Sequence, residues 1–168
     1  MYLFVDTEFV PDENGRHLLL SIGLCGPHAQ EFYAEHAVQE ATASDDFLVT
    51  HVMPQLGRIR CLRSSFRGIG LALLRWLHQF DGQDVQLCYD YSADRQAFED
   101  LVNIAAPGSS AQVTANHVGY LLEDEVGSKA ANACWTELCR TRGIERHHAL
   151  ADALALRARF YAVHGREA

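Results

Sequence analysis

The sequence lacks several features that would place it in particular classes of protein. Its 168 residues contain no C-x-x-C pair, and five cysteines are an odd number, which argues against a disulfide framework or a zinc site. No apolar run approaches the roughly 18 residues that a membrane-spanning helix needs. The first residues are acidic and lack the basic region of a signal peptide. We therefore expect one cytoplasmic domain over residues 1–168, with reduced thiols and no membrane association.

Lysine is almost absent: the chain has one lysine, Lys129, and thirteen arginines. The net charge is −8, from 14 basic and 22 acidic residues, which argues against a protein that coats nucleic acid nonspecifically. An enzyme acting on nucleic acid remains compatible with this charge, because clustered carboxylates can be metal ligands. Five arginines fall within one stretch and are either phosphate contacts or exposed surface charges: Arg58, Arg60, Arg63, Arg67 and Arg75.

The apolar pattern predicts an α/β fold that begins with three strands. The predicted strands cover residues 2–5, 17–25, 30–36 and 85–89, and short polar turns make the first three an antiparallel meander. The predicted helices cover residues 44–52, 66–80, 93–105, 130–142 and 148–163. Between residues 112 and 129 the pattern indicates a short strand at 113–115, and residues 118–122 fit either a helix or a strand. This order predicts a mixed sheet with helices packed on it.

Two acids, Asp6 and Glu8, follow the first apolar run. Residues two apart on a strand point to the same face, so these carboxylates lie side by side and repel each other unless a cation lies between them. The alternative is a strand end that enters solvent with both acids exposed. Apolar residues at 4–5 and 9–10 favour a core strand, and therefore the metal site.

Near the other end, the stretch HHALAD contains His147, His148 and Asp152. His148 and Asp152 are four residues apart and share one face of a helix. His147 is five residues from Asp152, about 140° away on a regular helix, so it reaches the same site only from a loop before the helix. The alternative is a surface histidine pair beside an ordinary acid of the first helical turn.

The segment after the fourth predicted strand adds Asp90 at the strand end and Asp94 at the start of the next helix. Carboxylate oxygens suit Mg²⁺ or Mn²⁺. The three motifs in order, FVDTEF, D-x-x-x-D and H-x-A-x-x-D, resemble the DEDDh group of 3′–5′ exonucleases. That resemblance implies a ribonuclease H-like mixed sheet flanked by helices. It also implies two Mg²⁺ or Mn²⁺ ions and His147 as the general base. The carboxylates that would bind the ions are Asp6, Glu8, Asp94 and Asp152.

Within that group, the DTEF start, the SIG of the second strand and the EFYA strand look most like RNase AS-type exoribonucleases. These are small dimeric enzymes that prefer adenylate-containing RNA. The resemblance implies hydrolysis of single-stranded or short RNA from its 3′ end, with release of nucleoside 5′-monophosphates, and a homodimer. We assign Thr7 and Phe9 to substrate binding, Phe9 being either a stacking surface for the terminal base or a core residue.

The sequence departs from the DEDDh pattern at two positions. Asp90 stands where the group often has asparagine, and His148 stands where many relatives have asparagine or arginine. The alternatives for function are a 3′–5′ DNA exonuclease, a catalytically silent nucleic-acid-binding module and a PIN-like endonuclease. The intact set of acids argues against the silent module, and a PIN-like site gives no reason for a histidine five residues before the last aspartate.

Overall fold

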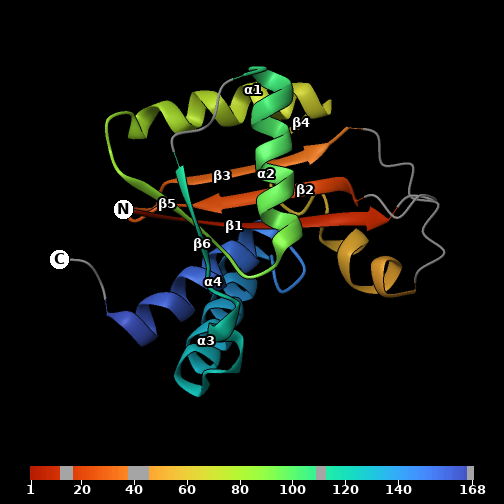
Figure 1. The fold of residues 1–168 in the computed structure, drawn as a ribbon. Coiled ribbons are helices and arrows are strands. Elements are labelled where there is room, and N and C mark those ends of the chain that lie inside the picture. The colour runs from red at the N-terminus through yellow and green to blue at the C-terminus, as the bar shows by residue number, and fades with distance from the viewer. Residues whose placement is uncertain (12–16, 38–45, 109–112, 166–168) are drawn as a thin grey trace.

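A six-stranded mixed sheet with β1 (Tyr2–Pro11) near its centre organises the fold (Figure 1). The computed structural model describes residues 1–11, 17–37, 46–108 and 113–165. The order is β4-β3-β2-β1-β5-β6, with β2 at His17–Cys25, β3 at Glu31–His36, β4 at Leu62–Ser64, β5 at Val85–Tyr89 and β6 at Val113–His117. The β1–β2 and β2–β3 pairs are antiparallel, and the other three are parallel. The predicted mixed sheet with an antiparallel start is confirmed.

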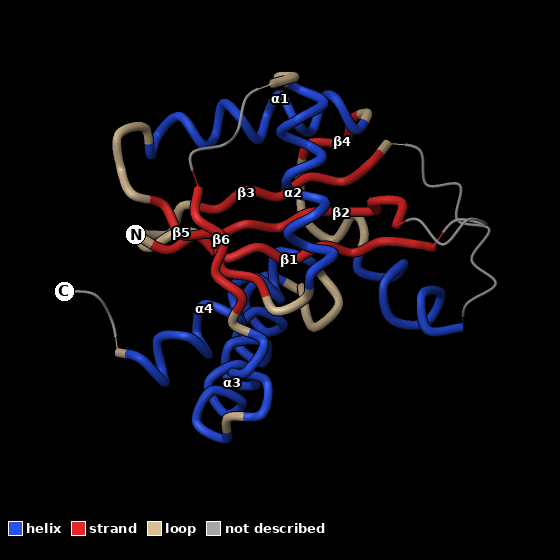
Figure 2. The backbone as a smooth tube through the Cα atoms, viewed as in Figure 1, coloured by secondary structure: helices blue, strands red, loops and turns tan. Residues whose placement is uncertain are grey.

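Helices cover both faces of this sheet (Figures 1 and 2). On one face, α1 (Phe66–Leu77) and α2 (Ser92–Ala105) pack against each other. On the other face, α4 (Ala149–His164) packs on β1, β2 and β3, and α3 (Glu125–Arg142) packs against α4. In the described part of the chain, no helix is both long enough and apolar enough to cross a membrane.

Strand β1 divides its side chains between two apolar cores, as the two-residue period of a strand requires. Val5 belongs to the core beneath α1 and α2, whereas Phe4 belongs to the core beneath α4. Asp6 and Glu8 continue the Phe4 side of the strand, so they point toward the helix that carries Asp152. The alternation of β1 thus brings the acid pair to α4.

The predicted end of the first strand at Val5 is wrong, because β1 continues to Pro11. Its antiparallel ladder with β2 pairs Asp6 with Gly23 and Glu8 with Ser21, and it shifts register only between Glu8 and Phe9. The two acids therefore lie within a paired strand, and they are not at a strand end that enters solvent. Hydrogen bonding to β2 extends the strand beyond its apolar run.

Two other boundaries differ from the prediction. Strand β4 was not predicted, since three residues are too few to show a period. Helix α3 begins at Glu125 instead of residue 130, because the Asp124 side chain accepts a hydrogen bond of 2.7 Å from Gly127 N and caps the helix. The predicted cap at Ser44–Asp45 lies outside the described residues. The helix predicted there becomes a π-helical turn, η1 (Leu48–Val52), and a short 3₁₀ helix, η2 (Met53–Gln55).

Candidate active site

Asp94 lies in the first turn of α2, where a buried carboxylate meets the middle of β1. Its Oδ1 accepts two hydrogen bonds from Thr7, 3.0 Å from the amide nitrogen and 2.7 Å from Oγ1. Thr7 points to the opposite side of β1 from its neighbours Asp6 and Glu8. Thr7 is itself buried, and its hydroxyl serves to orient Asp94. The predicted contact between Thr7 and substrate stays a prediction.

Asp152 lies in the first turn of α4 and is held from two directions. Trp135 Nε1 on α3 donates a hydrogen bond of 2.6 Å to Oδ1, and the His147 backbone amide donates one of 2.8 Å to Oδ2. His147 lies in the loop before α4, with a left-handed φ of 70°. This conformation is uncommon for a side-chain-bearing residue, and it turns His147 back toward the carboxylate five residues later. The predicted loop position of His147 is confirmed.

The acids and the histidine come together in two adjoining clusters. Oxygen atoms of Asp6, Asp90 and Asp94 lie within 4.8 Å of one another. A second set, made of Glu8, Asp152 and one imidazole nitrogen of His147, is equally close. The structure thus joins residues from β1, the β5–α2 connection and the start of α4. Asp90, whose direction the sequence left open, points into the first cluster.

Burial and mutual repulsion raise the pKa of every carboxyl group in the predicted metal set. Burial is the main cause at Asp6, followed by the charges of Asp94, Asp152, Glu8 and Asp90, and it places this pKa well above the usual range. Burial likewise raises the pKa to about 8 at Glu8, about 7 at Asp94 and about 6 at Asp152. Holding these carboxylates together therefore costs the folded state free energy, which a bound cation would offset.

The residues present fit divalent metal ions. Within the described part of the chain, Asp6 Oδ2 and Asp94 Oδ2 are buried and receive no hydrogen bond. Buried polar atoms are normally paired, so these two oxygens call for a ligand. The ligand set is all carboxylate apart from one imidazole, a chemistry that suits Mg²⁺ or Mn²⁺.

Two aromatic rings lie close to the His147 imidazole. Phe47 meets it edge to face, with ring centroids 4.9 Å apart, and the His51 ring lies 5.7 Å away on η1. Burial first, and then the charges of Arg146 and His51, lower the pKa of His147 below its usual value. The ring is therefore neutral at neutral pH and able to accept a proton.

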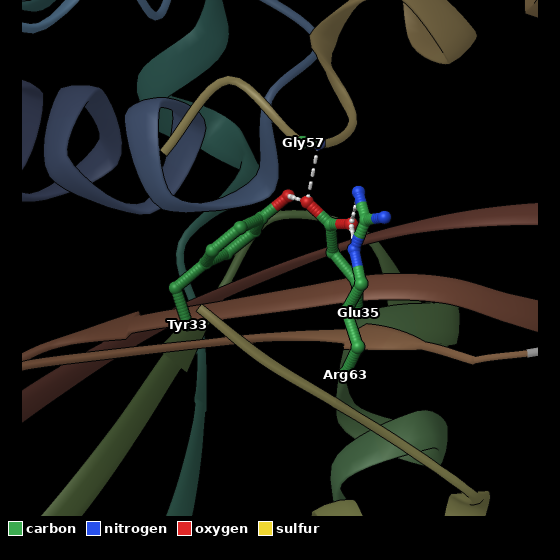
Figure 3. A network of polar contacts seen from close by, with 4 residues as sticks. All are labelled: Tyr33, Glu35, Gly57 and Arg63. Atoms are coloured by element: carbon green, nitrogen blue, oxygen red, sulfur yellow. Dashed lines mark hydrogen bonds and ion pairs between the residues drawn. The ribbon is translucent and has the colours of Figure 1, made fainter. Parts of the chain in front are cut away.

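His148 occupies a different environment from its neighbour. Its side chain is 1% exposed and stacks on Tyr33, with ring centroids 4.3 Å apart. Behind Tyr33, the buried carboxylate of Glu35 ties three segments together, accepting from Tyr33 Oη at 3.0 Å and Gly57 N at 2.7 Å and pairing with Arg63 at 2.7 Å (Figure 3). Burial lowers the pKa of His148 to about 4. His148 therefore supports the loop and lies apart from both clusters of ligand-type residues.

Gly23 on β2 allows α4 to approach the sheet. A β-carbon at this position would overlap the backbone of Ala149 and Leu150 at the start of α4. Because Gly23 pairs with Asp6, this close approach brings the first turn of α4, with Asp152, against the acid pair of β1.

An aromatic pocket lies beside the end of β1, on the face of the sheet that α1 and α2 cover. The Phe9 ring stacks on His17 at a centroid distance of 4.0 Å, and Tyr91 lies parallel to Phe9 at 6.1 Å. The pocket has a volume of about 520 Å³, and its walls come from β1, β2, α1 and α2. It includes Phe9, Phe66 and Gln96. This pocket can receive a flat, partly apolar group beside Phe9.

The arginine-rich stretch is only partly available for phosphate. Arg63 pairs with Glu35, and Arg58 Nε donates a hydrogen bond of 2.7 Å to Pro54 O. Trp135 and Arg146 are site residues that the sequence did not single out. The Arg146 Cζ lies 5.4 Å from the centroid of the Trp135 ring. Trp135 is seventeen residues from Asp152 on another helix, so no local spacing connects them.

Comparison with known proteins finds similarity in three-dimensional structure alone. No family model matches the sequence, and no curated protein matches it. Among solved structures, the chain is similar to the nuclease domain of 3′hExo, a DEDDh family member, bound to rAMP. The TM-score is 0.54 at 14% sequence identity, and the match covers 96% of this chain and 90% of that one. The chain has the fold of a DEDDh nuclease domain. The predicted ribonuclease H-like fold is therefore confirmed.

Proposed function

We propose that this protein is a divalent-metal-dependent 3′–5′ exoribonuclease that releases nucleoside 5′-monophosphates from single-stranded or short RNA. One observation carries the proposal. Four acids from three separate segments come together with the His147 imidazole, in a fold shared with a DEDDh nuclease domain. These acids are Asp6, Glu8, Asp94 and Asp152. The neighbour's bound rAMP favours a ribonucleotide as the ligand.

The four acids would hold two Mg²⁺ or Mn²⁺ ions, which supply Lewis-acid stabilisation of a phosphoryl group and its leaving oxygen. Thr7 fixes one oxygen of Asp94 and leaves the other for a ligand. Trp135 and the His147 amide orient Asp152 by donating one hydrogen bond to each of its carboxylate oxygens. These contacts preorganise the carboxylates before substrate arrives.

His147 acts as the general base. It accepts a proton from the attacking water at the imidazole nitrogen that faces Glu8 and Asp152, and its lowered pKa keeps that nitrogen unprotonated at neutral pH. Attack on the terminal phosphodiester breaks its bond to the 3′ oxygen of the preceding nucleotide, and that oxygen leaves with a proton. The products are a nucleoside 5′-monophosphate and a shortened RNA that ends in a 3′-hydroxyl.

The terminal base stacks on Phe9 in the pocket between β1, β2, α1 and α2, where His17 extends the aromatic surface and Tyr91 lies near Phe9. The resemblance to RNase AS-type exoribonucleases adds a preference for adenylate-containing RNA and a homodimer. A cytoplasmic location belongs to the same proposal.

The test uses RNA and DNA oligomers of one sequence, labelled at the 5′ end and incubated with Mg²⁺, Mn²⁺ or EDTA. We expect a ladder that shortens from the 3′ end on RNA, requires metal and yields nucleoside 5′-monophosphates. Faster cleavage of DNA than of RNA would favour the alternative function, a 3′–5′ DNA exonuclease with the same chemistry. Internal cuts, or cleavage in EDTA, would overturn the proposal.

A further inference from the structure

An exposed guanidinium lies beside the proposed active site, where its charge helps to lower the pKa of His147. Arg146 directly precedes His147, and its Cζ lies 5.4 Å from the centroid of the Trp135 ring. Trp135 in turn donates its indole N–H to Asp152. The cation–π contact restrains the long arginine side chain, so its charge stays close to the acid cluster. A positive charge is thus held in a defined place at the rim of the site.

Other arginines on this side of the protein are engaged elsewhere. Arg142 pairs with Glu31 and Arg140 with Glu137, whereas Arg157 donates to Gly26 O and Arg159 to Leu121 O. Arg146 has no carboxylate within ion-pair distance among residues 1–11, 17–37, 46–108 and 113–165. No described residue accepts a hydrogen bond from its five N–H donors, and a guanidinium matches the oxygens of a phosphodiester.

The charge of the site calls for such a group. RNA is a polyanion, and the convergent acids with the overall charge of −8 repel it. Bound cations would offset this repulsion most strongly at the phosphate that they contact. Upstream phosphates need positive charge from the protein, and Arg146 supplies it at the edge of the site. Such phosphate contacts position a strand without reading its bases.

We infer that Arg146, held by Trp135, binds a backbone phosphate of the RNA strand upstream of the scissile bond. This inference rests on the proposed function and deepens it by naming a substrate-positioning residue. The upstream position follows from exposure, because the scissile phosphate must reach the buried oxygens of Asp6 and Asp94. Arg146 is exposed and lies against Trp135, and neither cluster of ligand-type residues includes it.

The test compares Arg146→Gln with the wild type on two substrates, a single-stranded RNA with many phosphates and a diribonucleotide with one phosphodiester. Loss of one charged contact raises the KM for the long RNA roughly tenfold. The slope of log kcat/KM against log salt becomes shallower by about 0.7, the value for one phosphate contact on a single strand. For the diribonucleotide, KM changes by less than about twofold, because it has no upstream phosphate, whereas any effect of the lost charge on His147 appears in kcat on both substrates alike.

Three further variants serve as controls. Arg140→Gln removes the same charge from an exposed site on α3, and it leaves the salt slope unchanged if the effect is a local contact. Arg146→Lys restores part of the affinity through charge, without the planar stacking. Trp135→Phe removes the donor to Asp152 but keeps a ring under the guanidinium, so its salt slope stays close to that of the wild type.

The outcomes separate this inference from the function on which it rests. If the wild type degrades RNA and Arg146→Gln keeps its KM and salt slope, the upstream contact is wrong while the nuclease stands. An equal rise in KM for both substrates would also overturn it, because Arg146 would then act on the scissile group or on the architecture of the site. If the wild type degrades no RNA, both proposals fail together.

Discussion

The backbone amide of His147 and Oδ2 of Asp152 are joined by a hydrogen bond of 2.8 Å. The residue that we propose as base and one proposed metal ligand are therefore positioned by the same short loop. The left-handed φ of His147 makes this bond possible, because it folds the chain back onto the first turn of α4. His148, the next residue, turns the other way and stacks on Tyr33.

This difference predicts opposite consequences for substitutions of the two histidines. His147→Ala removes the proton acceptor and should lower kcat on RNA by roughly 10² to 10⁴, with little change in Tm because the ring is half-buried. His148→Ala removes a buried ring and should lower Tm, while the folded fraction keeps its turnover. Steady-state kinetics well below both Tm values, with thermal unfolding measured in parallel, separates the two. A larger loss of turnover in His148→Ala would reverse the assignment.

Asp94→Asn should lower RNA hydrolysis and raise the thermal stability of the metal-free protein. The substituted amide keeps an oxygen for the two Thr7 donors, and it removes a charge from the crowded cluster of Asp6 and Asp90. The variant should lose RNA hydrolysis, because a neutral amide is a poorer ligand than a carboxylate. In EDTA it should unfold at a higher temperature than the wild type, by about 2–4 °C for each kcal/mol of relief. A lower Tm in EDTA would show that repulsion does not burden the metal-free site.

The stability of the metal-free protein should fall as pH rises. Folding raises the pKa to about 8 at Glu8, about 7 at Asp94 and about 6 at Asp152, whereas the unfolded carboxyls titrate near their ordinary values. Between the unfolded and the folded pKa values, the folded state binds more protons than the unfolded state. The free energy of unfolding therefore decreases as pH rises through this window.

Thermal unfolding in EDTA tests this prediction. We expect a higher Tm near about pH 6 than near about pH 8, and a smaller difference when Mg²⁺ or Mn²⁺ is present, since a cation favours the ionised carboxylates. The matched control is Asp94→Asn, which should reduce the pH dependence in EDTA. A Tm in EDTA that rises steadily to about pH 8 would contradict the linkage argument.

Gly23→Ala tests the approach of α4 to the sheet. The added methyl group overlaps the backbone of Ala149 and Leu150, so α4 must move away from β2, at a cost of about 1–3 kcal/mol. Because Asp152 moves with α4, metal affinity and RNA hydrolysis should also fall. Gly82→Ala is the control. Gly82 has open space around it and a φ of +79°, so that change should cost some stability through backbone strain and leave activity unchanged. Equal activity in the two variants would separate Gly23 from the site.

The sequence alone determined much of the local structure. The period of two in the first apolar run put Asp6 and Glu8 on one face of a strand, and the spacing to Asp152 put His147 in a loop. Both follow from backbone geometry, which acts over a few residues. The extension of β1 to Pro11 could not be predicted in this way, because hydrogen bonds from β2 hold the strand beyond its apolar residues.

Only the tertiary structure decided which distant side chains meet. It turned Asp90 toward Asp6 and Asp94, gave the Thr7 hydroxyl to Asp94, and brought Trp135 from α3 to Asp152. These partners depend on how α2, α3 and α4 pack on the two faces of the sheet, and packing couples residues that have no fixed spacing in the chain. The acids of the proposed site were therefore visible in the sequence, whereas the donors that orient them appeared only with the fold.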